Sequence, residues 1–114
     1  MDRNFKPSYE NLTTTQVKEK LDRGEQFRLI DVREPGEFAI ARIVGAELLP
    51  LSRATEWLNT LPHDQQIVFF CHSGVRSEQI AYYLTRQLGF TNVANMLGGI
   101  DDWSMQIDPR VPRY

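Results

Sequence analysis

The four consecutive apolar residues from Ile67 to Phe70 constrain the fold of this chain more than any other stretch of its sequence. A strand with one solvated face alternates apolar and polar residues, whereas a strand buried on both faces is apolar throughout. Strands of the second kind belong to parallel sheets whose crossover helices cover both faces. We therefore expect residues 67–70 to form a strand near the middle of a largely parallel sheet.

The rest of the chain fits the same architecture, because short apolar runs alternate with amphipathic stretches along its whole length. Further apolar runs occupy 27–32, 46–49 and 93–97, and the first and last of them predict strands. The amphipathic stretches predict helices over 14–23, over 37–43, from Ser52 onward and from about Val75 onward. Thr13 or Thr14 can cap the first helix, and Gly24 ends it. The pattern is that of an α/β fold.

A chain of 114 residues has the length of one domain and can bury a core without disulfides or a metal. We expect a single domain over residues 1–114. An extended C-terminal tail is expected at about 105–114, because Pro109 and Pro112 forbid a continuing helix. The sequence has no evident apolar excess, which favours a monomer.

Charge and hydropathy argue against several classes of partner. The net charge is -2, and the 13 Lys and Arg residues are spread along the chain, so we expect no binding of nucleic acid. No apolar stretch approaches the ~20 residues that span a bilayer, so no membrane partner is expected. The polar N-terminus from Met1 to Asn4 lacks the apolar core of a secretory signal, and a lone cysteine suits a reducing compartment. These observations favour the cytoplasm.

The only cysteine, Cys71, stands at the junction between the apolar run and a polar loop. A loop that joins a strand to a helix leaves backbone N–H groups free to point inward, and with the positive end of the helix they stabilise an anion. Gly74 permits a positive φ in this loop, and Arg76 adds a positive charge where the helix begins. Because the same field favours thiolate over thiol, we interpret Cys71 as a nucleophile in an anion-binding loop.

Each of these residues also has a simpler interpretation. A lone cysteine after a strand is more often a small buried apolar residue, Gly74 suits any tight turn, and Arg76 can be a solvated helix charge. Together the three residues favour an active site with a nucleophilic cysteine in an anion-binding loop. His72 adjoins the cysteine, but successive side chains point in different directions, so we expect it not to be catalytic. His72 and His63 have no metal-ligand spacing with the cysteine, and no metal is expected.

Ligand sites of parallel sheets gather beyond the carboxyl ends of the strands. The loops that follow the three predicted strands should therefore converge. This convergence brings Asp31, Arg33 and the pair Gly98-Gly99 towards the cysteine loop. Asp31 can pair there with Arg76 or with Arg33 and hold the loop in shape, although it can also be a simple turn residue.

Three segments resemble, in order and spacing, the signatures of rhodanese domains: Asp31-Val32-Arg33-Glu34 with Glu37-Phe38, the loop from Cys71 to Ser77, and Leu97-Gly98-Gly99 with Trp103. The resemblance implies an α/β fold with a central parallel five-stranded sheet flanked by helices on both faces. It also implies a thiosulfate-type sulfurtransferase that needs no cofactor. In such enzymes a cysteine takes a sulfane sulfur from a donor such as thiosulfate, becomes a persulfide and passes the sulfur to a nucleophilic acceptor.

The resemblance assigns the persulfide to Cys71. The loop residues that would bind it are His72, Ser73, Gly74, Val75, Arg76 and Ser77. The backbone N–H groups of residues 72–76 would hold the anionic sulfur, and Arg76 would assist with charge and loop geometry. Asp31 would brace the loop, with Arg33 as a further supporting residue. The implied partners are a small-molecule or protein persulfide donor and a thiol acceptor.

Loop length favours sulfur chemistry over phosphorus chemistry. Four residues separate Cys71 from Arg76, whereas similar cysteine phosphatases have five, and the wider loop suits a tetrahedral phosphoryl group. The chain departs from the family at Ala41, Arg42 and Val44, where many members have glycine, histidine and proline. No role of that histidine therefore carries over to this chain.

The last residues, 107–114, resemble the tail of rhodanese domains fused to adenylating enzymes that charge ubiquitin-like sulfur carriers. A sulfur-carrier protein is therefore a candidate partner, and such a partnership would operate between separate proteins. Three alternatives to sulfur transfer stay open: a non-catalytic rhodanese-like interaction module, a thiol redox sensor and a phosphatase.

Overall fold

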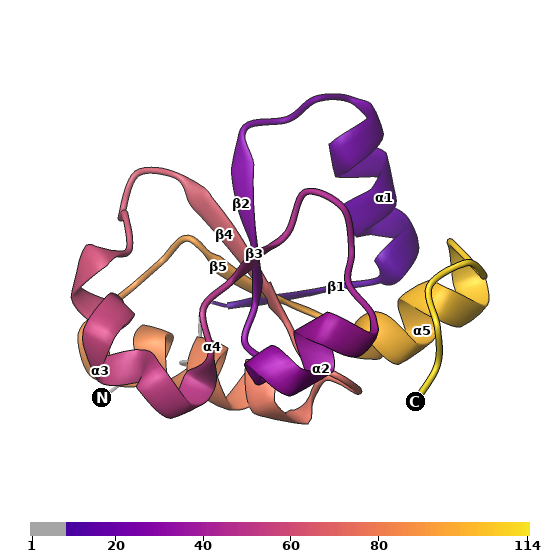
Figure 1. The fold of residues 1–114 in the computed structure, drawn as a ribbon. Coiled ribbons are helices and arrows are strands. Elements are labelled where there is room, and N and C mark those ends of the chain that lie inside the picture. Colours follow the sequence, from indigo (N-terminus) through magenta and orange to yellow (C-terminus); the bar gives the residue numbers. More distant parts are fainter. Residues whose placement is uncertain (1–8) are drawn as a thin grey trace.

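Five parallel strands form the sheet in the computed structural model, which describes residues 9–114 (Figure 1). The strands are β1 (Glu10–Leu12), β2 (Phe27–Asp31), β3 (Glu47–Leu48), β4 (Gln66–Phe70) and β5 (Val93–Met96). Their order across the sheet is β1-β5-β4-β2-β3. The central position predicted for the strand at 67–70 is therefore confirmed. The N-terminal residues Met1 to Asn4, on which the expected absence of a secretory signal rests, lie outside the described residues.

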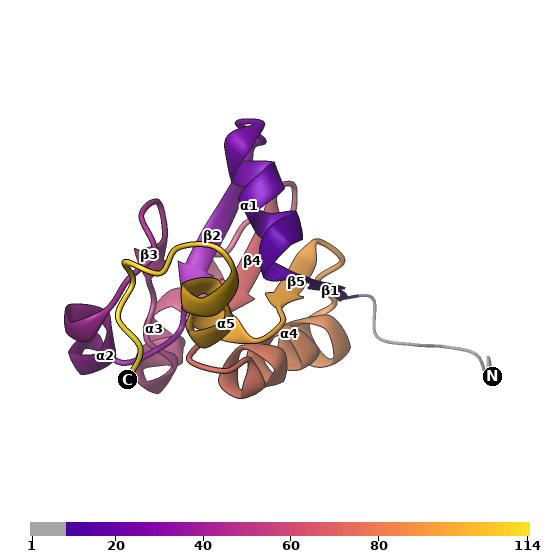
Figure 2. The same cartoon turned by 90° about the vertical axis from the view of Figure 1, so that its right-hand side faces the viewer.

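Helices cover both faces of this sheet (Figure 2). The helices in residues 9–114 are α1 (Thr14–Asp22), α2 (Pro35–Ile40), α3 (Ala54–Trp57), α4 (Val75–Leu88) and α5 (Gly99–Gln106), with turns of 3-10 helix at Leu51–Arg53 and Leu58–Thr60. α1 and α5 pack on one face, and α3 and α4 pack on the other. The expected α/β fold, with a parallel five-stranded sheet between two layers of helices, is confirmed.

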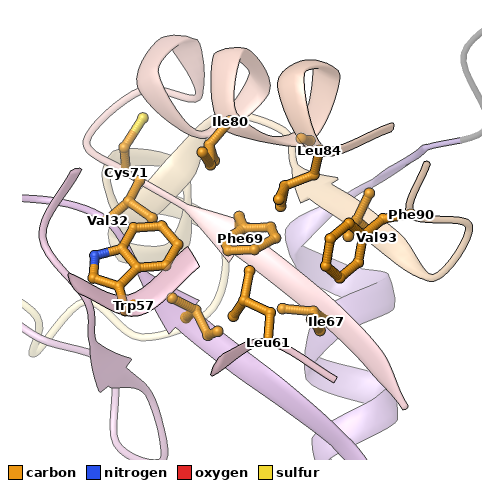
Figure 3. Close-up of a cluster of buried hydrophobic side chains, with 12 residues drawn as sticks. Val32, Trp57, Leu61, Ile67, Phe69, Cys71, Ile80, Leu84, Phe90 and Val93 are labelled. Atoms are coloured by element: carbon orange, nitrogen blue, oxygen red, sulfur yellow. The ribbon is translucent and has the colours of Figure 1, made fainter. Parts of the chain in front are cut away.

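The residues of β4 point alternately into two apolar clusters, one on each face of the sheet. Ile67 and Phe69 pack against α3 and α4 (Figure 3). Val68 and Phe70 pack against α1 and α5. All four side chains are completely buried, and each contributes about 1.5–3 kcal/mol on leaving water. This two-sided burial explains why the strand carries no polar position.

Local cap signals place the first and fourth helices correctly. Thr13 is the N-cap of α1, where its side chain accepts a hydrogen bond from the Gln16 N–H (3.1 Å) and the Gln16 side chain accepts one from the Thr13 N–H (2.8 Å). α4 begins at Val75, as predicted. Gly89, at φ 74°, ends α4 in the left-handed conformation that glycine adopts without strain.

Two predicted helices have different boundaries in the structure. The helix predicted over 37–43 begins at Pro35 and ends at Ile40, because proline fits the first turn, where no N–H is needed. The helix predicted from Ser52 onward is present as α3, but it begins at Ala54, so the predicted Ser52 cap is wrong. Ser52 lies within a 3-10 turn that precedes α3, and its hydroxyl donates a hydrogen bond to Glu34 instead.

Strand β1 lies at an edge of the sheet and was not predicted from the sequence. Its three residues include the exposed polar residues Glu10 and Asn11, and so lack an apolar pattern. At the other end of the described chain, α5 continues to Gln106, so residues 105 and 106 are helical. Residues 107–114 then return from α5 towards α2 (Figure 2). No helix within residues 9–114 combines the length and apolarity that a membrane span requires.

Candidate active site

Cys71 directly follows the central strand, and its side chain lies at the end of one of the two apolar clusters (Figure 3). The residue is only 1% exposed. Its sulfur accepts hydrogen bonds from the backbone N–H of Gly74 (3.1 Å) and of Ser77 (3.4 Å). Gly74 has φ 105° and immediately precedes α4, so the sulfur lies at the positive end of a helix. The loop thus presents N–H donors to the sulfur, as an anion-binding loop requires.

The N-terminus of α5 holds the carbonyl groups of this loop. The Ile100 N–H donates to the Cys71 carbonyl (2.9 Å), and the Asp101 N–H donates to the His72 carbonyl (3.0 Å). Gly99, at φ 60°, lies so close that a Cβ atom there would collide with both carbonyls. The sequence predicts Gly98-Gly99 near the site, and the structure adds the reason for glycine. Because α5 binds these carbonyls, N–H groups of the loop remain available to the sulfur.

The remaining loop residues have different environments. The backbone range expected to hold a persulfide was 72–76, and the two N–H groups on the sulfur belong to Gly74 and to Ser77, one residue beyond it. Ser77 is fully buried. Ser73 and Val75 are exposed at the surface of the loop. The structure therefore brings the sulfur, two backbone donors and a buried serine together.

Arg76 is held by Glu37 of α2 rather than by a group on the loop. Two of its guanidinium nitrogens donate to the two carboxylate oxygens of Glu37, at 2.6 and 2.9 Å. The alternative in which Asp31 pairs with Arg76 is therefore wrong. Hydrogen bonds from Arg76 lower the pKa of Glu37 to about 2, and those to Glu37 raise the pKa of Arg76. The positive charge expected beside Cys71 is thus neutralised by a carboxylate that sequence analysis did not assign.

Replacing Glu37 with glutamine is expected to remove an acid-sensitive part of the stability. A carboxyl whose pKa falls on folding stabilises the protein above its ordinary pKa of 4.5, and this contribution is lost as the pH falls towards the folded value of about 2. Wild type should therefore lose more of its free energy of unfolding than Glu37→Gln between about pH 5 and pH 2. Urea unfolding at several pH values measures the difference. Parallel profiles for the two proteins would contradict this assignment, and Glu56→Gln, in an exposed pair with Arg53, is the control.

Asp31 and Arg33 form a fully buried ion pair. Arg33 Nε and Nη2 donate to the two carboxylate oxygens of Asp31, at 2.9 and 2.6 Å. The other guanidinium hydrogens are donated to the carbonyls of Ala41 (2.6 Å) and Glu37 (3.3 Å) and to the hydroxyl of Tyr114 (2.8 Å). All five donors of the guanidinium are therefore used. Of the two partners expected for Asp31, the structure has Arg33.

Tyr114 joins three parts of the site and was missed in the sequence. Its ring stacks on His72, with centroids 4.1 Å apart and planes 8° apart. Its hydroxyl accepts a hydrogen bond from Arg33 and donates one to Glu37, both at 2.8 Å. The resemblance of the tail indicated the segment, but no pattern in the sequence indicates where this ring lies. The non-catalytic role expected for His72 stays a prediction.

This arrangement occurs in a chain that matches a known protein family. A model of the rhodanese-like domain family matches residues 13–106, which include the cysteine loop, the buried ion pair and Glu37. The chain belongs to the rhodanese-like family. Its cysteine loop therefore follows the central strand of a rhodanese-like domain, and Tyr114 lies beyond the matched residues.

Individual relatives agree with the rhodanese-like assignment. A sulfurtransferase of Allochromatium vinosum is 33% identical, over 82% of this chain and 86% of that protein. The crystal structure of a rhodanese-like domain protein from Staphylococcus aureus has a TM-score of 0.75 and 30% identity, over 82% of this chain and 90% of that one. MoeZ of Mycobacterium tuberculosis, named as a probable adenylyltransferase/sulfurtransferase, is 37% identical over 90% of this chain. The chain spans only 26% of the length of MoeZ.

Proposed function

We propose that the chain is a sulfurtransferase in which Cys71 carries a sulfane sulfur from a donor to a nucleophilic acceptor. The observation that carries this proposal is the position of the cysteine sulfur, which accepts hydrogen bonds from Gly74 and Ser77 at the N-terminus of α4. Relatives named as sulfurtransferases support the same chemistry. Thiosulfate and protein persulfides are the donors that we propose, with a thiol as the acceptor.

The first step forms the persulfide. The Cys71 thiolate attacks the sulfane sulfur of the donor, a new sulfur–sulfur bond forms, and the bond between that sulfur and the rest of the donor breaks. The electron pair of the broken bond leaves with the donor, which departs as sulfite when thiosulfate is used. The N–H groups of the loop stabilise negative charge on the bound sulfur, and they need no reorganisation at the moment of reaction.

The second step returns the cysteine to its starting state. The acceptor attacks the outer sulfur of the persulfide, and the Cys71 thiolate leaves with the electrons of the broken bond. Arg76 contributes to loop geometry through its pair with Glu37. The Asp31–Arg33 pair supports the loop through Tyr114, which accepts a hydrogen bond from Arg33 and stacks on His72. Every turnover needs a reduced thiol, which favours a reducing compartment such as the cytoplasm.

Intact mass spectrometry after incubation with thiosulfate tests this proposal. Wild type is expected to gain one sulfur atom and to lose it on addition of cyanide, which accepts sulfane sulfur. Protein whose Cys71 has been alkylated beforehand is the control and is expected to gain nothing. Absence of a gain with thiosulfate and with a persulfide donor would overturn the proposal in favour of a non-catalytic interaction module.

We propose a sulfur-carrier protein as one acceptor of the sulfur. Two relatives support this choice. MoeZ has a name that combines adenylyltransferase and sulfurtransferase, and YrkF of Bacillus subtilis is named as a sulfur carrier protein. The partners here would be separate proteins. A phosphatase is disfavoured by the four-residue spacing between Cys71 and Arg76.

A further inference from the structure

The hydroxyl of Ser77 lies between two acceptors and can serve only one of them. It lies 2.6 Å from Asn95 Oδ1 and 3.5 Å from Cys71 Sγ. Ser77 is fully buried and Asn95 is 1% exposed, so water cannot easily replace either partner. A hydroxyl has one hydrogen to donate and lone pairs to accept with. With the hydrogen donated to Asn95, the side facing the sulfur carries only lone pairs.

The line of hydrogen bonds continues from Asn95 to the surface. Asn95 Nδ2 donates to Oδ1 of Asn11 at 3.4 Å. The two asparagines are register partners on neighbouring strands, Asn95 on the buried β5 and Asn11 on the edge strand β1. Asn11 is exposed. A chain of hydrogen-bonding groups therefore runs from the buried sulfur to the edge of the sheet. Its members, Ser77, Asn95 and Asn11, can each both donate and accept a hydrogen bond.

The direction of hydrogen bonding along this chain can be reversed. In the arrangement of the structure, Ser77 donates to Asn95 and Asn95 donates to Asn11. This direction leaves a lone pair of Ser77 to accept the S–H of a thiol. A half-turn of each carboxamide exchanges its oxygen and nitrogen with almost no change of shape. In the reversed direction Asn11 donates to Asn95, Asn95 donates to Ser77, and the Ser77 hydroxyl donates to the sulfur.

We propose that Asn95 is a positioning residue that decides, through Ser77, whether the hydroxyl accepts from or donates to the Cys71 sulfur. The first direction matches the thiol, and the reversed one gives an anionic sulfur a third donor beside the two N–H groups. Only hydrogen bonds reverse, and no proton crosses the chain. The benefit to a persulfide rests on the proposed function, whereas the effect on the cysteine itself does not.

An Asn95→Leu variant, made with and without the Ser77 hydroxyl, tests the proposal. Leucine has a similar volume and no acceptor, so the Ser77 hydroxyl is free to donate to the sulfur. We expect the thiolate fraction of Cys71, read from ultraviolet absorbance, and its rate of alkylation by iodoacetamide at neutral pH to rise by about tenfold, as for one hydrogen bond to a charged group. The same substitution in a Ser77→Ala protein should change neither quantity. Damage to packing alone would expose the buried thiol and speed alkylation to the same extent in the Ser77→Ala background. An equal rise in both backgrounds, or no rise in a protein with a native circular dichroism spectrum, would overturn the proposal.

A second variant acts from the surface and does not disturb the core. Aspartate at position 11 can only accept, so Asn11→Asp fixes the direction in which Asn95 donates outward and accepts from Ser77. We expect slower alkylation of Cys71 in this variant, and a clearly smaller decrease in the Ser77→Ala background, where only the charge of the new carboxylate acts. Equal decreases in both backgrounds would overturn the proposal. Alkylation needs no sulfur donor, so these results are separate from the persulfide test of the proposed function.

Discussion

Serine in place of Cys71 is expected to abolish sulfur transfer while leaving the fold intact. A hydroxyl at this position can accept hydrogen bonds from the N–H groups of Gly74 and Ser77, which now donate to the sulfur, so the loop should keep its geometry. It cannot form a persulfide, and loss of a covalent nucleophile typically costs a factor of about a thousand or more in rate. Turnover of thiosulfate with cyanide as acceptor measures the loss, and thermal unfolding checks the fold.

The control for this prediction is wild type whose cysteine has been alkylated, which should be equally inactive. A Cys71→Ser protein that kept its turnover would place the nucleophile elsewhere in the chain. Since Cys71 is the only cysteine, such a result would remove persulfide chemistry on the protein altogether.

Methionine in place of Arg33 is expected to lower the free energy of unfolding by about 3–5 kcal/mol. The change leaves the carboxylate of Asp31, which is fully buried, without its counter-charge. It also removes the hydrogen bonds from the guanidinium to the carbonyls of Ala41 and Glu37. A small domain has about 5–15 kcal/mol of total stability, so the loss is a large part of it. Urea unfolding followed by circular dichroism measures the effect.

Arg28→Met is the matched control for the buried arginine. Arg28 also binds a carboxylate with two nitrogens, that of Glu47 at 2.8 and 2.9 Å, but both residues are partly exposed. The exposed pair is expected to contribute under about 1 kcal/mol. The double variant Asp31→Leu with Arg33→Met should recover part of the loss, because it removes both buried charges. Equal losses for Arg33→Met and Arg28→Met would contradict the importance of the buried pair.

Those parts of the fold that depend on local signals could be predicted from the sequence. The unbroken apolar run at 67–70 indicated a strand buried on both faces, and β4 is the centre of the sheet. Gly74 and Val75 mark the start of α4, and Gly89 marks its end. In each case the residues that show the pattern in the sequence are the same residues that form the strand or the end of the helix. Strand β1 carries no such signal, because backbone pairing with β5, and not the pattern of its own side chains, makes it a strand.

The electrostatic partners in the site could not be predicted, because they come from distant parts of the chain. Arg76 is 39 residues from Glu37, and Arg33 is 81 residues from Tyr114. The chain has 15 acidic residues, and spacing alone does not single out Glu37 among them. Convergence at the carboxyl ends of the strands indicated the neighbourhood, in which Asp31 was correctly placed beside Arg33 as one of two options. Selection between such options needs side-chain geometry.

The carboxylate of Glu37 balances the positive charge of Arg76. The cysteine sulfur is therefore held by the dipoles of backbone N–H groups rather than by a nearby net charge. Mobile ions weaken attraction between charges that lie further apart than about a Debye length, ~10 Å at 0.1 M salt. They cannot enter between the sulfur and N–H groups at 3.1 and 3.4 Å. The loop would therefore bind a sulfur anion equally well at low and at high ionic strength. Any effect of salt on transfer would then report how the donor arrives, and not how its sulfur is held.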